Sequence, residues 1–264
     1  MKLDIYQIDA FAEQAFSGNP AAIIPLDRWL EDREMQSIAE ENNLSETAFI
    51  VATESGYHIR WFTPYCEVDL CGHATLAAAY VAIQFLQETR NPICFDSKSG
   101  ELFVSYTMDS QQKTILTLDF PASEYHEVET PQALIQGLGK TPVKTVAAAD
   151  YLAIFSSEEE VLQLAPNFNL LQKLDRRGVI ASAPGKNVDF VSRFFAPNAG
   201  INEDPVTGSA HCLLTPYWAK QLDLTRLTAK QRSARGGSLI CTLKGERVLI
   251  SGYATLYLRG EITY

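Results

Sequence analysis

The sequence predicts an α+β protein made of two similar lobes, each a curved and mainly antiparallel sheet wrapped around one central helix. Three observations lead to this fold class. The segment from Gly72 to about residue 88 is apolar on all sides, which is typical of a buried helix. A second apolar segment runs from Gly208 to about residue 221. Both segments lie among short alternating stretches separated by turn residues, a pattern that predicts antiparallel strands.

A sequence motif precedes both apolar segments. The first copy reads Arg60-Trp61-Phe62-Thr63-Pro64 and the second reads Arg193-Phe194-Phe195-Ala196-Pro197. The arginines are 133 residues apart (193 − 60) and the helix-opening glycines are 136 apart (208 − 72), in a chain of 264 residues. We interpret this repeat as an ancestral duplication. It predicts two domains, an N-terminal lobe over residues 1–120 and a C-terminal lobe over residues 121–264.

Alternation of apolar and polar residues locates the elements of the first lobe. It predicts helices near 32–42 and 72–88, and strands at 3–11, 21–24, 46–52, 57–63, 93–96, 101–107 and 113–119. Phe120-Pro121 breaks the pattern, and the charged stretch from there to Glu129 is expected to be a linker.

The second lobe begins with Thr130 and Pro131, which are typical of the N-cap and first residue of a helix reaching about residue 138. A short helix is expected at 158–164, and strands at 143–148, 151–155, 179–183, 188–195, 238–243, 246–250 and 254–259. Pro216 lies inside the second apolar helix. Because proline has no N–H, it should kink that helix or shorten its first section.

Composition limits the possible functions. A net charge of −10 and a pI of about 4.9, without any basic run, argue against a nucleic-acid partner. No apolar run reaches ~18 residues, so no membrane span is expected. The N-terminus alternates like a strand and lacks a signal-peptide layout, which favours a cytoplasmic protein. The five cysteines form no CxxC pair, so neither a metal site nor a disulfide framework is expected.

The starts of the two apolar helices are candidate binding sites. Gly72 and Gly208 let a ligand approach the backbone closely. The first amides of a helix, together with its dipole, attract anions. His73 adds a side chain that can donate or titrate near neutral pH, and Ser209 occupies the matching position in the second lobe. The pattern predicts an anion or oxyanion site, with two purely structural core helices as the alternative.

Two carboxylates are candidates for chemistry. Glu46 stands at the mouth of an apolar strand, where a carboxylate is costly unless it is paired or functional. It is therefore a candidate general acid and base, and a turn glutamate facing solvent is the alternative. Asp204 lies just before the second apolar helix, either facing a substrate or capping that helix. Asp69, three residues before Gly72, is expected to be a cap.

Cys71 and a glycine-containing turn complete the candidates. A thiol at a helix N-terminus can carry protons, but the matching residue of the second lobe is Thr207, which cannot. A mechanism that uses one thiol from each lobe would therefore lack its partner. Gly18 and Asn19, followed by proline, predict a turn that also lines the binding site.

Five motifs, in matching order and spacing, now carry a resemblance to a known family. They are Gly18-Asn19-Pro20-Ala21-Ala22, Asn43-Leu44-Ser45-Glu46-Thr47-Ala48-Phe49, Arg60-Trp61-Phe62-Thr63-Pro64, Cys71-Gly72-His73-Ala74-Thr75 and Glu203-Asp204-Pro205-Val206-Thr207-Gly208-Ser209-Ala210. On these motifs, and over essentially its full length, the chain resembles the phenazine-biosynthesis PhzF-like isomerases, relatives of diaminopimelate epimerase and proline racemase. The resemblance implies the diaminopimelate epimerase-like fold, with the active site in the cleft between the lobes. It also allows the residues near 255–264 to return to the N-terminal lobe.

The same resemblance implies cofactor-independent isomerisation of a small, carboxylate-bearing metabolite, with no metal. Glu46 would remove a proton from carbon and return one to another atom of the same substrate. The implied catalytic set is Glu46, His73, Asp204 and Ser209, and the implied substrate-binding set is Gly72, Gly208, Gly18 and Asn19.

Two other functions stay open at this stage. One is an amino-acid epimerase or racemase that uses Glu46 and Cys71 as bases on opposite faces of the substrate. The other is a small-molecule-binding protein without turnover on the same scaffold. A homodimer is expected to be plausible for a chain of this size.

Overall fold

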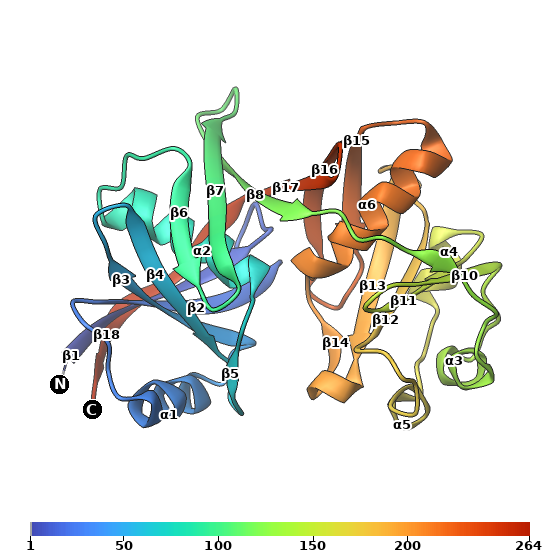
Figure 1. The fold of residues 1–264 in the computed structure, drawn as a ribbon, viewed down its shortest axis with the longest axis horizontal. Coiled ribbons are helices and arrows are strands. Elements are labelled where there is room, and N and C mark those ends of the chain that lie inside the picture. Colours follow the sequence, from blue (N-terminus) through green and yellow to red (C-terminus); the bar gives the residue numbers. More distant parts are fainter. Residues whose placement is uncertain (1) are drawn as a thin grey trace. The chain divides into compact units, whose positions relative to one another are not determined.

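In a computed structural model, which describes residues 2–264, the chain divides into two compact units (Figure 1). Unit 1 holds the residues up to Asp119 together with Ser251–Tyr264, and unit 2 holds Phe120–Ile250. The chain leaves unit 1 within β8 (Thr114–Pro121) and returns to it within β17 (Arg247–Gly252).

Unit 1 is a mixed but mainly antiparallel sheet with two helices. Its elements are β1 (Lys2–Ala10), β2 (Asn19–Leu26), α1 (Asp32–Asn42), β3 (Glu46–Ala52), β4 (Gly56–Phe62), β5 (Glu67–Val68), α2 (Gly72–Phe85), β6 (Ile93–Ser97), β7 (Gly100–Met108), most of β8, and β18 (Ala254–Thr263). Strand β1 is antiparallel to β2 and β18, and β2 is parallel to β3. Strand β4 is antiparallel to β3 and parallel to β6, which is antiparallel to β7.

The sheet of unit 1 wraps around α2, as predicted (Figure 1). The helix contacts β1, β2, β3, β7 and β18, and five of its nine buried residues are alanines. Small side chains let strands approach a helix closely from several directions. On the opposite face of the sheet, Met35 and Ile38 of α1 pack with Ile24 and Phe49. Strands β2 and β3 are buried over most of their length, which explains their nearly continuous apolar sequences.

Unit 2 repeats this plan. Its elements are β9 (His126–Glu127), α3 (Gln132–Leu138), β10 (Lys144–Ala147), β11 (Tyr151–Ile154), α4 (Glu158–Leu162), α5 (Phe168–Leu171), β12 (Val179–Pro184), β13 (Phe190–Ala196), the 3-10 helix η1 (Pro197–Ala199), β14 (Ile201–Asp204), α6 (Gly208–Leu222), β15 (Arg226–Gln231), β16 (Gly237–Lys244) and most of β17. The pairings of β10, β11, β12, β13, β15 and β16 have the same directions, in the same order, as those of β1, β2, β3, β4, β6 and β7. The sequence repeat is therefore a repeat of the fold.

An ion pair recurs in the repeated motif of each unit. Nε and Nη2 of Arg60 donate to the two carboxylate oxygens of Glu67 at 2.7 and 2.9 Å. Nε and Nη2 of Arg193 donate to those of Glu203 at 2.8 and 2.9 Å. Such two-pronged pairs fix geometry as well as charge. Each one ties a strand to the segment that leads into the central helix.

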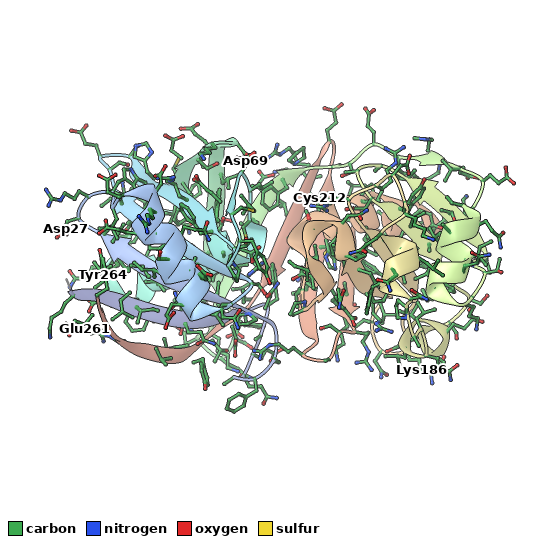
Figure 2. The ribbon with its side chains drawn as sticks, turned by 90° about the horizontal axis from the view of Figure 1, so that it is seen from below. Asp27, Asp69, Lys186, Cys212, Glu261 and Tyr264 are labelled. Atoms are coloured by element: carbon green, nitrogen blue, oxygen red, sulfur yellow. The ribbon has the colours of Figure 1, made fainter. Side chains whose placement is uncertain are left out.

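Helix α6 runs unbroken from Gly208 to Leu222, so Pro216 does not shorten it, and the kink expected as the alternative stays a prediction. Proline provides no N–H for the carbonyl of Cys212, four residues earlier. The backbone N–H of Ser123 donates to that carbonyl instead, at 2.9 Å (Cys212 is labelled in Figure 2). The helix loses one internal bond, but the carbonyl does not stay unpaired.

Three further local expectations differ from the structure. The helix after Thr130 begins at Gln132, with Pro131 as its N-cap rather than its first residue. The expected linker contains β9, which pairs with β10. Strand β15 was not predicted, because its exposed charged residues hide the alternation with three buried ones.

The C-terminal strand β18 pairs with β1 along its length, from Lys2 opposite Thr263 to Ala10 opposite Ala254. Lys2 also forms an ion pair with Glu261, which is labelled in Figure 2. By its hydrogen bonds, this last strand is part of unit 1. Within residues 2–264, no helix is long and apolar enough to cross a membrane.

Candidate functional site

The side chains of Glu46 and His73 meet in unit 1. Glu46 is the first residue of β3, and His73 is the second residue of α2. Nε2 of His73 lies 3.1 Å from Oε2 of Glu46, and the two side chains are only 6% and 12% exposed. A carboxylate held beside an imidazole, largely out of water, is suited to holding and moving a proton.

The other imidazole nitrogen of His73 faces Asn19 and Cys71. Nδ1 lies 3.2 Å from Nδ2 of Asn19 and 3.5 Å from Sγ of Cys71. Asn19 is fully buried and begins β2. These contacts hold the ring so that its other nitrogen, Nε2, faces Glu46.

The turn that precedes Asn19 requires glycine at position 18. Its φ is +70°, a conformation that side chains disfavour. A Cβ atom at this position would lie 2.2 Å from the carbonyl oxygen of Ala10. The turn therefore needs glycine whatever the ligand, and it places Asn19 at the histidine.

The pKa values of His73 and Cys71 are both shifted by burial and by their neighbours. Burial lowers the pKa of His73, but its interactions with Cys71 and Glu46 outweigh burial and raise that pKa well above its usual value. Burial, followed by the charge of Glu46, raises the pKa of Cys71 to about 11. The buried thiol of Cys71 therefore stays protonated at neutral pH.

Unit 2 holds the other predicted residues at the start of α6. Asp204 is buried, and its carboxylate accepts a short hydrogen bond from the hydroxyl of Thr207. Oε1 of the buried Gln231 accepts from the backbone N–H of Thr207 at 2.9 Å, and its Nε2 donates to the carbonyl of Asp204 at 2.8 Å. Oγ of Ser209 accepts from Nη2 of Arg177 at 3.0 Å.

Neither central helix is capped by the side chain of its N-cap residue. These residues are Cys71 in α2 and Thr207 in α6, and the expectation that Asp69 caps α2 was wrong (Asp69 is labelled in Figure 2). Helices α4 and α5, in contrast, receive an ordinary serine or asparagine cap. The first amides of α2 and α6, at Gly72 and Gly208, therefore suit an external anion.

Residues 8–260 match the sequence profile of the phenazine biosynthesis-like (PhzC-PhzF) proteins. The chain belongs to this family.

Relatives of the PhzF family match the chain from end to end. A Pseudomonas aeruginosa protein described as an uncharacterized isomerase is 51% identical over 262 residues, with 99% of each chain covered. The crystal structure of a PhzF-family protein from Enterococcus faecalis has a TM-score of 0.95 at 44% identity, with 100% of each chain covered. Relatives with isomerase names support an isomerase-type function for this chain.

A more distant likeness extends to epimerases. A hydroxyproline epimerase from Agrobacterium vitis has a TM-score of 0.64 at 9% identity, covering 99% of this chain and 92% of the epimerase. At that identity, the likeness concerns the fold alone. It confirms the diaminopimelate epimerase-like fold class predicted from the sequence.

The repeated strand register shows which residues at the start of β12 in unit 2 correspond to Glu46 in unit 1. Thr47 pairs with Phe62, and Val179 pairs with Phe195, the matching phenylalanine of the repeated motif. By this register, Glu46 corresponds to the residue just before Val179, and Arg177 lies one position earlier. In unit 1 the carboxylate of Glu46 contacts His73 at the start of α2. In unit 2 the guanidinium of Arg177 contacts Ser209 at the start of α6.

Sequence reasoning did not identify Gln231, Arg177 or Asp150. Nε and Nη2 of Arg177 donate to the carboxylate of buried Asp150 at 3.0 and 2.5 Å. Gln231 is the last residue of β15, Asp150 precedes β11 and Arg177 lies just before β12. No sequence motif links the three. No local sequence pattern points to Arg177, because its partners lie far away in the chain.

Proposed function

We propose that this PhzF-family protein is a cofactor-independent isomerase that moves a proton within a small, carboxylate-bearing metabolite. Glu46 is the single acid and base. Its carboxylate takes a proton from a C–H bond of the substrate, and the resulting carboxylic acid returns a proton to another atom of the same molecule. The proposed catalytic set also includes His73, Asp204 and Ser209.

The 3.1 Å contact between Glu46 and His73 carries this proposal. The imidazole holds the carboxylate in a fixed position, which proton transfer to and from a substrate requires. Low exposure of both side chains keeps water away from the transferred proton. The pair thus supplies a base, a neighbouring positive charge and a dry environment.

In this proposal, each helix start can hold an anionic group of the substrate. The backbone amide of Gly72 is the donor in unit 1, and in unit 2 the donors are the amide of Gly208 and the hydroxyl of Ser209. Asp204 accepts a hydrogen bond from a substrate amine or hydroxyl. Because Asn19 is fully buried, its part in substrate binding is indirect, through the orientation of His73.

Amino-acid epimerisation is the second candidate, and the position of Cys71 favours it. Sγ of Cys71 lies 3.5 Å from the His73 ring, and its high pKa keeps it protonated as a donor at neutral pH. Thr207 stands at the matching position in unit 2 and supplies no second thiol. Optical rotation of an amino-acid panel, compared with a Cys71→Ser variant, separates the two reactions.

Deuterium exchange tests the main proposal. Small carboxylates are incubated with the protein in heavy water, and loss of a C–H signal is followed by proton NMR. We expect exchange with at least one substrate and a loss of about 10²–10⁴-fold in Glu46→Gln. Glu41→Gln is the matched control, because Glu41 is an exposed glutamate at the end of α1. Full activity in Glu46→Gln would contradict the role of Glu46.

The same assay addresses a binding protein without turnover. Such a protein would bind a carboxylate, detected as a saturable shift of the His73 signals, without any exchange at carbon. That result would replace the isomerase proposal.

A further inference from the structure

Arg177 reaches the start of α6 from the segment just before β12. By strand register, it lies one position before the counterpart of Glu46. Glu46 contacts His73, the second residue of α2, and Arg177 contacts Ser209, the second residue of α6. In both units a side chain at the mouth of a strand therefore meets the same position of the central helix.

The guanidinium of Arg177 is held in a fixed orientation. Its Nε and Nη2 atoms donate to the two carboxylate oxygens of buried Asp150. Its Cζ atom also lies 5.3 Å from the centroid of the Phe194 ring. A two-pronged bond together with an aromatic contact fixes both the plane and the direction of the group. The guanidinium is thus in place before any ligand arrives.

The bond between Arg177 and Ser209 can have only one direction. Nη2 of Arg177 lies 3.0 Å from Oγ of Ser209, and arginine has no acceptor, so Oγ accepts. The hydroxyl proton of Ser209 then points away from the guanidinium. Among residues 2–264, neither this proton nor Nη1 of Arg177 has a hydrogen-bond partner. Because the arginine side chain is 46% exposed, a ligand can reach these donors.

We propose that Arg177 binds the anionic group of the substrate together with Ser209, whose hydroxyl it orients. One carboxylate oxygen of the substrate accepts from the Ser209 hydroxyl, and the other accepts from Nη1 of Arg177. This inference rests on the proposed function, to which it adds a residue and a reason for selecting a planar anion with two oxygens. Binding itself can be measured without turnover.

Directed hydrogen bonds, rather than surplus charge, distinguish this site. The carboxylate of Asp150 balances the positive charge of Arg177. Lysine would keep that charge, but it is a point charge without the planar fork that holds Asp150, Ser209 and a ligand at once. We therefore expect Arg177→Lys to fail nearly as completely as Arg177→Gln.

Acetate is the probe for this site. Labelled protein is titrated with sodium acetate, and the backbone amide signal of Ser209 is followed by NMR. We expect a saturable shift in wild type and in Arg176→Gln, because Arg176 packs over Tyr151 instead. Acetate affinity should fall about tenfold or more in Arg177→Gln and Arg177→Lys, the usual effect of losing a charge-assisted hydrogen bond. If the exchange assay shows activity, the same variants should raise KM by a similar factor, with kcat changed less than about threefold.

A double variant separates binding from stability. Arg177→Gln leaves the buried carboxylate of Asp150 without its partner, and adding Asp150→Asn removes that charge. The double variant should recover stability in denaturant unfolding, while acetate binding stays weak. Recovery of binding along with stability would show that Arg177 is only structural, and would overturn the inference.

The remaining outcomes also decide between the proposals. Absence of a saturable shift in wild type, or equal acetate affinity in folded Arg177→Gln, overturns the role of Arg177. Exchange activity whose KM is the same in Arg177→Gln also overturns that role, but it leaves the isomerase proposal intact. Acetate binding that depends on Arg177, in a protein without exchange activity, supports the anion site and counts against the isomerase proposal alone.

Discussion

Nε2 of His73 lies 3.1 Å from Oε2 of Glu46, and this contact joins the start of α2 to the start of β3. Interactions with Cys71 and with Glu46 both raise the pKa of His73 against the effect of burial. The pKa of His73 therefore depends on the charge of Glu46.

Replacing Glu46 by glutamine should lower the pKa of His73. The neutral amide removes the nearby negative charge, while burial continues to disfavour the imidazolium. An NMR titration of the His73 ring in wild type and in Glu46→Gln measures the change, with Glu41→Gln as control. In wild type, the folded protein holds this proton more tightly than the unfolded chain. The pair thus stabilises the fold below the usual histidine pKa, and that contribution fades as pH rises through the folded value. An unaltered titration in Glu46→Gln would rule out the coupling.

Replacing Gly18 by alanine should destabilise the protein by several kcal/mol. The added Cβ would meet the carbonyl oxygen of Ala10 at 2.2 Å, in a backbone with φ of +70°. Gly100→Ala is the matched control, since its φ is +91° but nothing lies within 4 Å of the added Cβ. It should cost only about 1 kcal/mol from backbone strain. Denaturant unfolding compares the two variants, and equal losses would show that the close approach at Gly18 is unimportant.

The network around Gln231 should stabilise the start of α6. Gln231→Leu leaves the N–H of Thr207 and the carbonyl of Asp204 without their partners. Because Gln231 is only 1% exposed, we expect a loss of about 2–4 kcal/mol in the free energy of unfolding. Gln111→Leu, at an exposed turn, should change it by less than about 0.5 kcal/mol. A small effect of Gln231→Leu would indicate that water takes over these bonds.

Arg177 and Asp150 should be coupled in stability. Asp150 is 4% exposed, so Arg177→Met strands a buried carboxylate. Because the arginine side chain is 46% exposed, water screens the pair and a loss of about 1–3 kcal/mol is expected. The double variant with Asp150→Asn should recover part of it, and Arg176→Met serves as control. Purely additive losses in this cycle would argue against direct coupling.

His211 should make the protein sensitive to mild acid. Burial lowers its pKa to about 4, against 6.5 for an ordinary histidine. The unfolded chain therefore binds a proton that the folded chain rejects, and stability falls as pH drops from about 6.5 toward 4, by up to about 3 kcal/mol. His211→Asn keeps a donor for the carbonyl of Thr207 and should flatten this part of the pH dependence. The exposed His126, replaced by glutamine, should not, and a similar slope in all three proteins would count against His211.

Local sequence patterns were sufficient to predict the α+β fold with two similar units. Repetition of the Arg-aromatic-Phe motif and of the apolar central helices predicts two alike units, because the same pattern buries the same faces. Interior elements with strong periodicity were located well. Strand β15 was missed because its charged residues mask the alternation. Pro216 does not shorten α6, and the carbonyl that lacks a helix partner because of it accepts from Ser123, a donor that no local pattern reveals.

Sequence by itself therefore determined which residues are chemically unusual: a carboxylate at a strand mouth, glycines at two helix starts, and a histidine and a serine beside them. Only the tertiary structure decided which groups touch. It set His73 between Glu46 and Asn19, and it paired Arg177 with Ser209. The physical reason is that hydrogen bonds and ion pairs depend on distances of about 3 Å, and such distances follow from strand register and helix packing rather than from any local pattern.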